Sequence, residues 1–320
     1  MEIPSLFILA VACFGFITLS KFLLKILSST WSTFIRPEKD LRSYGAWAAI
    51  TGSTDGIGKA IAFDIAARGL NLVLIGRNPS KLEATSREIR QIHGEVKVKT
   101  VTVDFSGAWR NGEEMARYVE AEIRGLDLGI LINNAGLAYP YARFMHEVDD
   151  RLMESVVGVN LAALTWITRA AVAGMMERGR GAIVNIGSGS SACLSSYPLY
   201  TVYAATKAYV TMLSKSMNLE YKQYGIDVQC QIPMLVATKM SSIKKASLFT
   251  PSAETYSKAS MRWIGQSDAI CIPYWPHALQ AFLISFFPNQ LVDNLVFRYF
   301  VGMRARGRRK DQKLHSTKLN

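Results

Sequence analysis

Between residues 46 and 232, short apolar runs alternate with longer amphipathic stretches. Apolar runs bounded by glycine or polar residues predict buried strands, and amphipathic stretches predict helices. We predict strands over residues 46–51, 71–75, 96–103, 128–132, 181–186 and 226–232, and helices over 59–68, 80–91, 148–176 and a last segment that ends at Tyr224. This alternation is typical of an α/β fold, here a doubly wound parallel sheet in a single domain.

A glycine-rich turn closes the first predicted strand, where the sequence runs from Thr51 to Gly58. A helix and a second strand follow within about 30 residues, as a dinucleotide-binding unit of the Rossmann type requires. Glycine lets the backbone approach a pyrophosphate, and the helix N-terminus adds unpaired N–H groups. Turns also use glycine for structural reasons alone, but this strand–helix context predicts a cofactor site. Its predicted binding residues are Gly52, Ser53, Thr54, Gly56, Ile57 and Gly58.

The end of the second predicted strand favours one nicotinamide cofactor over the other. An NAD enzyme usually carries an acidic residue there, which binds the ribose 2′-hydroxyl. This chain has Gly76-Arg77-Asn78 instead. The missing carboxylate leaves room for a phosphate, and Arg77 offers it a bidentate donor, with a solvated surface arginine as the alternative. We therefore predict NADPH as the cofactor.

Polar residues stand at later positions that could also belong to a site. Asp104 follows the third strand and either accepts from an adenine amino group or caps the turn. Asn133-Asn134-Ala135-Gly136 ends the fourth strand, where the alternatives are a structural turn and a cofactor-lining role. Asn160 interrupts an apolar helical run, and a buried asparagine needs partners, either as a satisfied core amide or in a polar site.

The main chemical signal is Tyr203-Ala204-Ala205-Thr206-Lys207. A tyrosine and a lysine four residues apart on a helix project from the same face. The ammonium favours the phenolate, so the tyrosine can give a proton to a substrate oxygen near neutral pH. Ser190 precedes Tyr203 by 13 residues, which makes it the candidate third member of the site.

Other hydroxyl groups lie close to this pair in the sequence. Ser188 and Ser191 flank Ser190, and we assign both to the local turn. Tyr197 and Tyr200 have no lysine four residues further on. We therefore predict that these two tyrosines form the wall of the pocket.

The N-terminal residues 3–20 carry no charge and are mostly apolar, about enough to cross a bilayer. A cleaved signal peptide is one alternative, but it needs a basic start, and position 2 is acidic. A buried core helix is the other. We predict an uncleaved anchor over residues 1–30. The basic residues after it place the rest of the chain in the cytosol; they are Lys21, Lys25, Arg36 and Lys39.

The C-terminal part is apolar first and basic afterwards. Residues 270–301 are apolar but broken by three prolines, so we expect them at the membrane interface or against the body. The last 17 residues hold seven Lys or Arg and one Asp, a net +6 of the total +12. No nucleic-acid motif accompanies this tail, so a membrane surface or a solvated disordered end explains it better. The four scattered cysteines indicate neither a disulfide framework nor a metal site.

Together these features resemble the short-chain dehydrogenase/reductases over residues 45–240. The matching features are Thr51-x-x-x-Gly56-x-Gly58, Asn133-Asn134-Ala135-Gly136, Asn160, Ser190 and Tyr203-x-x-x-Lys207. Within that family, the apolar N-terminus and Pro233-x-x-Val236-Ala237-Thr238 are similar to the membrane-bound very-long-chain 3-oxoacyl-CoA reductases and to relatives that act on steroid 17-ketones. The residues before Pro233 look plant-like. Met234 departs from the glycine that often follows this proline.

The resemblance implies a role for each matched residue. Tyr203 would be the proton donor, and Lys207 would lower its pKa and bind the nicotinamide ribose. Ser190 would hydrogen-bond the substrate carbonyl. Asn160 would hold a water in a proton relay. Thr238 would contact the nicotinamide carboxamide, Asp104 and Asn133 would line the adenine and ribose, and the turn glycines would hold the pyrophosphate. Ala135 is placed with the cofactor-lining residues, and no metal is expected.

These predictions divide the chain into an anchor (1–30), an NADP-binding reductase domain (40–265), an apolar substrate- or membrane-associated segment (266–303) and a basic tail (304–320). The resemblance implies an enzyme on the cytosolic face of the endoplasmic reticulum membrane. It would use NADPH to reduce the 3-keto group of a long acyl-CoA in fatty acid elongation, with other elongation enzymes as candidate partners. Reduction of a steroid or other lipid ketone, and a non-catalytic NADPH-binding scaffold, are the alternatives.

Overall fold

The computed structural model describes residues 2–266 and 268–319, without the side chains of residues 2–6, 25, 26, 29 and 313–319. The chain forms two compact units, Met1–Glu38 and Lys39–Asn320. The sequence-based boundaries at residues 265 and 303 therefore fall inside the second unit.

The first unit is dominated by one helix, α1 (Glu2–Thr30), which is followed by the π-helical turn η1 (Trp31–Ile35). Within α1, Phe7–Leu24 is long and apolar enough to cross a membrane and buries none of its residues within the protein. Among the described residues, the helical stretch 150–178 passes the same test, but it lies more than half buried in the second unit. The apolar α1 is thus a candidate membrane anchor. The side chain of Lys25 lies outside the described residues.

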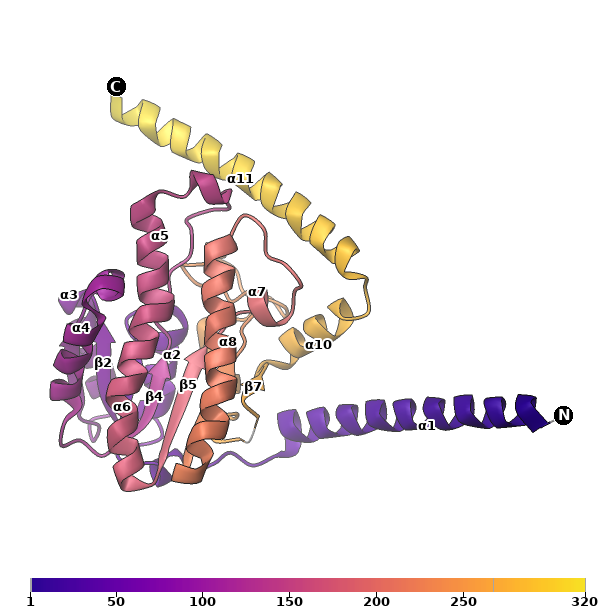
Figure 1. The fold of residues 1–320 in the computed structure, drawn as a ribbon. Coiled ribbons are helices and arrows are strands. Elements are labelled where there is room, and N and C mark those ends of the chain that lie inside the picture. Colours follow the sequence, from indigo (N-terminus) through magenta and orange to yellow (C-terminus); the bar gives the residue numbers. More distant parts are fainter. Residues whose placement is uncertain (1, 267, 320) are drawn as a thin grey trace. The chain divides into compact units, whose positions relative to one another are not determined.

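The second unit is built on a parallel sheet with seven strands in its described residues (Figure 1). Their order is β3-β2-β1-β4-β5-β6-β7, so the direction of winding reverses between β1 and β4. Ligands of such sheets bind outside the carboxyl ends of the strands at this reversal. The strands are β1 (Trp47–Thr51), β2 (Asn71–Gly76), β3 (Val98–Thr102), β4 (Leu128–Asn133), β5 (Gly181–Ile186), β6 (Ile226–Gln231) and β7 (Ile270–Cys271).

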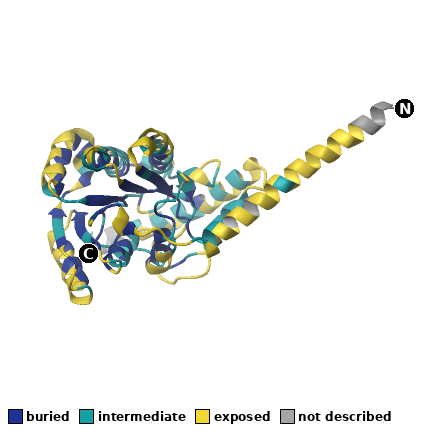
Figure 2. Cartoon of the chain, turned by 90° about the horizontal axis from the view of Figure 1, so that it is seen from below, coloured by how far each residue is buried: buried dark blue, intermediate teal, exposed yellow. Residues whose placement is uncertain are grey.

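Helices cover both faces of the sheet, which makes three layers. One face packs against α2 (Gly56–Ala66), α3 (Pro79–Ile92) and α9 (Ala253–Met261). The other packs against α4 (Ala108–Ile123), α6 (Leu164–Arg178) and α8 (Thr201–Tyr221). Because both faces are covered, β4 and β5 are buried along their whole length, and Figure 2 shows the strands in dark blue between helices with exposed outer faces. The doubly wound parallel sheet predicted from the sequence is confirmed.

The long helix predicted over residues 148–176 is divided in the structure. It consists of α5 (Asp150–Val157), the π-helical segment η5 (Gly158–Ala163) and α6. π-helical segments inside α-helices often occur at functional sites. This one carries Asn160 into the interior of the second unit.

The apolar pattern of the sequence did not separate the two C-terminal helices, α10 (Trp275–Ile284) and α11 (Asn289–Leu319). Residues 270–301 divide between β7, α10 and the start of α11. α11 then continues through the basic tail to Leu319, so the tail is helical in its described part rather than disordered. In Figure 1, α11 passes over the upper ends of α5 and α8.

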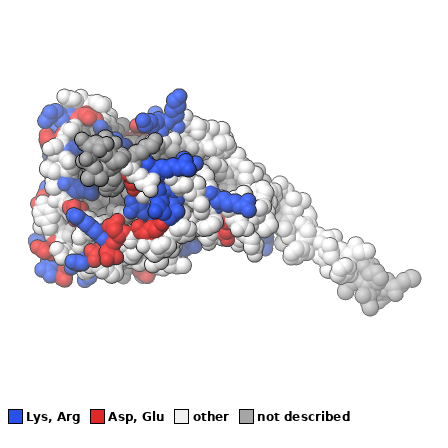
Figure 3. All heavy atoms as spheres, turned by 90° about the horizontal axis from the view of Figure 1, so that it is seen from above, with Lys and Arg blue, Asp and Glu red and all other residues white. Residues whose placement is uncertain are grey.

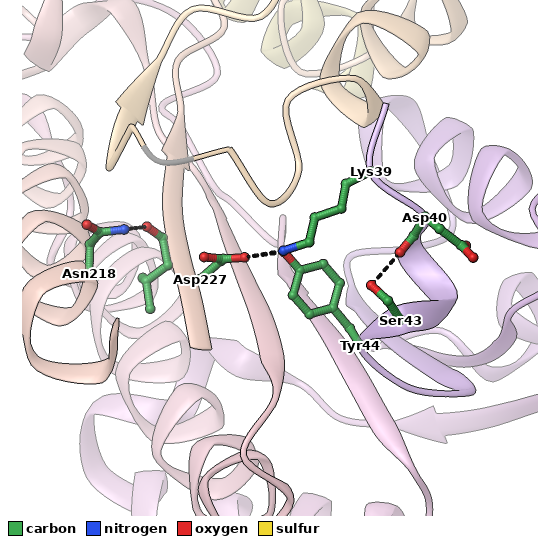
Figure 4. Close-up of polar contacts among 7 residues, drawn as sticks. Lys39, Asp40, Ser43, Tyr44, Asn218 and Asp227 are labelled. Atoms are coloured by element: carbon green, nitrogen blue, oxygen red, sulfur yellow. Dashed lines mark hydrogen bonds and ion pairs between the residues drawn. The ribbon is translucent and has the colours of Figure 1, made fainter. Parts of the chain in front are cut away.

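A small polar cluster ties the beginning of the second unit to the strand β6 (Figure 4). Lys39 Nζ donates to Asp227 Oδ2 at 3.0 Å and to the Tyr44 hydroxyl at 2.7 Å, while the Tyr44 phenol donates to the same carboxylate. Burial, and then the bond to Asp227, raise the pKa of Tyr44. Asp227 lies near the amino end of β6. This cluster is therefore at the amino ends of the strands, whereas the site described next is at their carboxyl ends.

Candidate active site

The glycine turn after β1 has the geometry that a dinucleotide site requires. Gly52 and Gly56 have φ angles of +67° and +52°, which side chains disfavour. A Cβ at Gly58 would lie 2.2 Å from Asn134 Nδ2 and 2.4 Å from the Gly52 carbonyl oxygen. The turn is therefore closed to side chains and leads directly into the N-terminus of α2, which Asp55 caps by accepting from the Gly56 N–H.

Asn134 fastens this turn to the turn after β4. Its Nδ2 donates to the carbonyls of Thr51 and Gly52 at 3.0 and 3.1 Å. The Thr51 hydroxyl accepts from the backbone N–H groups of Asn134 and Ala135, both at 3.0 Å. From the sequence, Asn134 was expected only as part of the turn motif, with no role of its own. The structure shows that it locks together the two turns at the reversal of the sheet.

The side chain of Asn133 points into the interior of the protein. It is buried, and its Nδ2 donates to Thr168 Oγ1 and Asn185 Oδ1, both at 2.8 Å. Asn185 in turn donates to Ser214 Oγ at 2.9 Å. This amide therefore links β4 to β5 and α6, and through Asn185 to α8. A contact between Asn133 and a cofactor stays a prediction.

Asn160 is held from two sides. Its Oδ1 accepts from the Leu137 N–H at 2.7 Å, and its Nδ2 donates to the Leu137 carbonyl at 2.9 Å and to Thr206 Oγ1 at 3.1 Å. A buried amide without partners would be costly, and here both ends are satisfied. Asn160 thus joins the chain after β4 to α8, where its partner Thr206 directly precedes Lys207.

Tyr203 has Ser188 beside it in the structure. Ser188 lies close enough to the Tyr203 hydroxyl to lower its pKa, and it also caps α7 (Gly189–Ala192) by accepting from the Ser190 N–H at 3.2 Å. Ser190 is buried, and its Oγ donates to Ser188 Oγ at 2.9 Å. From the sequence we assigned Ser188 to the local turn and Ser190 to the substrate. In the structure Ser188 both caps the turn and contacts the tyrosine, and the signal that could have found it is its position two residues after β5.

Burial sets the charge states of the Tyr203–Lys207 pair. It raises the pKa of Tyr203, and the hydrogen bond from Ser188 opposes this rise. Burial also lowers the pKa of Lys207 to about 8, so the ammonium form still dominates at pH 7. Lys207 Nζ donates to the Ile186 carbonyl at 2.8 Å. From the sequence we expected Lys207 to lower the pKa of Tyr203, whereas in the structure burial raises it and Ser188 opposes the rise.

The loop after β6 brings Thr238 to the glycine turn. A Cβ at Gly56 would lie 3.2 Å from Thr238 Cγ2. A Cβ at Gly136 would lie 3.7 Å from each of three atoms: Asn160 Oδ1, Lys207 Nζ and Met240 Cε. The segment 238–240 therefore lies between the glycine turn and the catalytic candidates.

His277 of α10 positions this loop and had no signal in the sequence. It is fully buried, and its Nδ1 accepts from the Met234 N–H at 3.2 Å while its Nε2 lies 3.2 Å from the Leu235 carbonyl. Burial lowers its pKa to about 4, so the ring is neutral at pH 7 and carries its proton on Nε2. Met234 replaces the usual glycine of the family, and His277 binds its backbone.

Two cofactor candidates lie further out. Arg77 is exposed directly after the last residue of β2. Asp104 accepts from the Ser106 N–H at 3.0 Å and so caps the short helix η3 (Phe105–Gly107). Of the two interpretations of Asp104, the structure contains the capping bond.

An aromatic wall extends from Tyr203. The Tyr200 ring lies 6.4 Å from the Tyr203 ring and 5.4 Å from Tyr139, with which it is stacked. Phe300 of α11 lies 5.2 Å from Tyr200 and 4.8 Å from Tyr197, measured between ring centroids. Tyr197 and Tyr200 thus form a wall, with α11 packed on it.

Ion pairs hold α11 in this position. Arg304 binds both carboxylate oxygens of Glu147, and Arg308 lies 3.6 Å from the same carboxylate. The Tyr141 hydroxyl donates to Asp311 at 2.6 Å, and Asp293 accepts from Ser195 and Ser196 at 2.7 Å. The hydrogen bond from Arg304 lowers the pKa of Glu147 to about 2, so this contact is present at all physiological pH values.

Comparison with known proteins agrees with this geometry. The model of the short chain dehydrogenase family matches residues 46–247. A very-long-chain 3-oxoacyl-CoA reductase-like protein of Arabidopsis thaliana is 47% identical, over 92% of this chain and 94% of that protein. The human very-long-chain 3-oxoacyl-CoA reductase is 35% identical over 84% of each chain.

Solved structures give the same result. A short-chain dehydrogenase from Sphingobium yanoikuyae in complex with NADPH is 28% identical and has a TM-score of 0.64, covering 77% of this chain and 95% of that one. A 7beta-hydroxysteroid dehydrogenase is also 28% identical with a TM-score of 0.64, covering 73% and 90%. This chain therefore belongs to the short-chain dehydrogenase family, whose members are NAD(P)-dependent oxidoreductases.

Proposed function

We propose that this protein uses NADPH to reduce the 3-keto group of a long-chain 3-oxoacyl-CoA to a 3-hydroxyl group, as a step of fatty acid elongation. The observation that carries this proposal is the arrangement of Ser188, Tyr203 and Lys207 around the carboxyl end of β5, next to an aromatic wall. The similarity to reductases of this name over nearly the whole chain supports the substrate class.

Each site residue has a task in this reaction. A bound nicotinamide cofactor supplies the hydride that adds to the carbonyl carbon. Tyr203 is protonated at neutral pH because its pKa is raised, so it can donate its proton to the carbonyl oxygen. Ser188 donates a hydrogen bond to the same oxygen, and the Lys207 ammonium stabilises the phenolate that forms. We retain Asn160 as a positioning residue, since its amide links Leu137 to Thr206.

The glycine turn and the loop after β6 fit a dinucleotide. Gly52, Gly56 and Gly58 leave space for a pyrophosphate at the N-terminus of α2, and Thr238 lies beside this turn. We propose Ser53, Thr54, Ile57 and Ala135 as backbone neighbours of the cofactor, and Asp104 near its adenine, as the sequence predicts.

Arg77 should select NADPH over NADH. The variant Arg77→Ala loses a charge-assisted contact with the 2′-phosphate, which costs about 1.5–3 kcal/mol. We expect the KM for NADPH to rise by about tenfold or more and the KM for NADH to stay the same. Steady-state kinetics with both cofactors measures this, and the control is Arg87→Ala, at an exposed arginine within α3. Equal changes for the two cofactors would rule out Arg77 as the selector.

We propose that α10 and the first half of α11 rest on the membrane and guide the acyl chain. α11 turns Val296, Phe300 and Met303 toward the aromatic wall. Other apolar side chains of this region are exposed to solvent: Trp275, Leu279, Leu283, Phe286, Phe287, Leu291 and Leu295. Such a large exposed apolar surface marks an interaction site, and apolar residues next to basic ones fit a membrane interface.

A chain-length series tests this proposal. Phe286 and Phe287 are 64% and 55% exposed. In the presence of vesicles, the wild-type protein should prefer long 3-oxoacyl-CoAs, because each buried methylene contributes about 0.8 kcal/mol. Replacing both phenylalanines with serine should reduce that preference, while the control Trp109→Ser, at an exposed tryptophan on α4, should keep it. If the double variant kept the wild-type preference for long chains, Phe286 and Phe287 would not guide the acyl chain.

We further propose that α1 anchors the protein in the endoplasmic reticulum membrane with the second unit in the cytosol. Alkaline carbonate extraction should leave the full-length protein in the membrane pellet. In intact microsomes, added protease should cut the C-terminal part. A C-terminus that is protected from protease, or an N-terminus processed beyond residue 20, would contradict this topology.

A further inference from the structure

A cavity of about 1030 Å³ lies beside the glycine turn in the second unit. It is formed by the N-terminal part of α2, the loop 237–244 and the start of α9, with one residue contributed by α11. Its size is at the upper end of the range for small-molecule sites, about 300–1,000 Å³. The proposed cofactor site shares only Gly56 and Thr238 with the lining of this cavity.

The cavity is lined by five lysines from four parts of the fold. They are Lys59 of α2, Lys239 and Lys244 of the loop, Lys258 of α9 and Lys310 of α11. Three acidic residues share the lining, namely Asp55, Asp64 and Glu254. Figure 3 looks onto the end of the molecule where α11 crosses, and there Lys and Arg side chains gather next to a group of acidic ones.

Two of these lysines are neutralised within the protein. Lys59 pairs with Glu88 at 2.7 Å, and Lys239 pairs with Asp55. Lys244, Lys258 and Lys310 form no ion pair with any side chain that the structure describes. Three cations that converge on one cavity from separate elements attract an anion with several charges.

The walls between the lysines are apolar. Phe63, Ala60 and Ile243 line the cavity, and Lys59 Nζ lies 5.7 Å from the centre of the Phe63 ring. A planar ring can pack on such surfaces while the lysines bind phosphate groups. Phosphates together with an aromatic base are the chemistry of a nucleotide.

The cavity is connected to the catalytic residues by two segments. The loop 237–244 places Met240 beside Lys207 and Asn160, and it contributes Lys239, Ile243 and Lys244 to the cavity. α11 carries Phe300 in the aromatic wall and Lys310 in the cavity, ten residues or about 15 Å apart along the helix. A ligand with a reactive end at Tyr203 and a phosphorylated end in the cavity would need an arm of that order.

We propose that this lysine-lined cavity binds the 3′-phosphorylated ADP group of the coenzyme A substrate. The inference rests on the proposed function, since it assigns a binding site to the nucleotide part of the same acyl-CoA substrate. The diphosphate of the cofactor shares the chemistry, but it is expected at the glycine turn, whereas Lys244, Lys258 and Lys310 belong to other elements. Bound coenzyme A would extend from these lysines under α11 to Tyr203.

The experiment compares Lys244→Glu/Lys258→Glu with the control Lys97→Glu, an exposed lysine just before β3. Each protein is given a 3-oxoacyl-CoA and the N-acetylcysteamine thioester of the same acyl group, which has no phosphate. We expect the double variant to raise the KM for the CoA ester at least tenfold, because contacts between charged groups are lost. The KM for the phosphate-free thioester and for NADPH should not change. Lys97→Glu should behave as the wild type.

Binding of adenosine 3′,5′-bisphosphate, measured by calorimetry, tests the cavity independently of turnover. The wild type and Lys97→Glu should bind it in the presence of saturating NADPH, and the double variant should not. A double variant that raises the KM for NADPH instead assigns the cavity to the cofactor and overturns the proposal, as does an unchanged KM for the CoA ester. If the wild type binds the bisphosphate but reduces no 3-oxoacyl thioester, the cavity assignment stands and the proposed reaction fails.

Discussion

Replacing Tyr203 with phenylalanine should abolish reduction of the 3-oxoacyl substrate and leave NADPH binding nearly unchanged. The substitution removes the hydroxyl that donates the proton and keeps the ring, which packs 6.4 Å from Tyr200. General acid catalysis contributes about 10²–10⁴-fold, so loss of the proton donor should lower the rate by that order. Single-turnover kinetics with NADPH in excess measures the loss.

Tyr200→Phe is the matched control for this variant. It removes a hydroxyl that contacts only Met303 Sδ at 3.5 Å among the described residues and keeps the same aromatic wall. Its rate should stay within a few fold of the wild type. If Tyr203→Phe kept more than a few per cent of the wild-type rate, or if Tyr200→Phe lost as much, Tyr203 would not be the acid.

Ser188→Ala should reduce kcat about a hundredfold, whereas Ser190→Ala should change it only several-fold. Ser188 lies beside the Tyr203 hydroxyl, where it can bind the developing alkoxide, and the loss of one such donor costs about 10²–10³-fold. Ser190 donates to Ser188 and so acts on the substrate only indirectly. The kinetics of the two variants therefore distinguish the two serines directly.

Stability has to be measured alongside, because Ser188 also caps α7. Loss of an N-cap costs about 1 kcal/mol of folding free energy, so Ser188→Ala should still be folded at 25 °C. Ser188→Thr keeps both the cap and a hydroxyl, and it should recover part of the activity. A larger loss of kcat in Ser190→Ala would restore the assignment that the spacing in the sequence favoured.

Most of the sheet could be predicted from the sequence because its strands are buried on both faces. A strand such as Gly181–Ile186 is apolar except for Asn185 and is bounded by turn residues, so its limits were predicted to the residue. The helix α4 (Ala108–Ile123) was missed, and its composition shows why. It contains Gly112, at which a Cβ would lie 2.2 Å from Trp166 Cδ1, and a non-helical Asn111. At Asn111 and Gly112 the backbone conformation is set by tertiary packing rather than by the helix propensity of the residues.

The candidate site was predictable where a motif fixes the backbone. The glycines of the first turn and the Tyr203–Lys207 spacing are local, so the sequence located them. The choice between Ser188 and Ser190 depends on the path of the chain from β5 into α7, which spacing alone does not determine. His277 lies 43 residues from the backbone N–H that it binds, and a contact between such distant residues leaves no pattern in the sequence.

The same limit applies to the C-terminal part. Its prolines indicated an interrupted apolar segment, and its basic residues indicated a separate tail. In the structure Arg304 and Asp311 of the tail bind Glu147 and Tyr141, so α11 is continuous across that boundary. Only the fold brings residues 141–147 close enough to bind this helix.

The central claim, that this chain is a 3-oxoacyl-CoA reductase, is tested most directly with the purified full-length protein and NADPH labelled with deuterium on the transferred position. A long-chain 3-oxoacyl-CoA and a steroid 17-ketone are offered side by side, and the products are identified by mass spectrometry. We expect the 3-hydroxyacyl-CoA with one deuterium at C3, formed in proportion to the NADPH consumed and at a much higher kcat/KM than the steroid alcohol. Faster reduction of the steroid, or oxidation of NADPH without a labelled 3-hydroxyacyl-CoA, would contradict the claim.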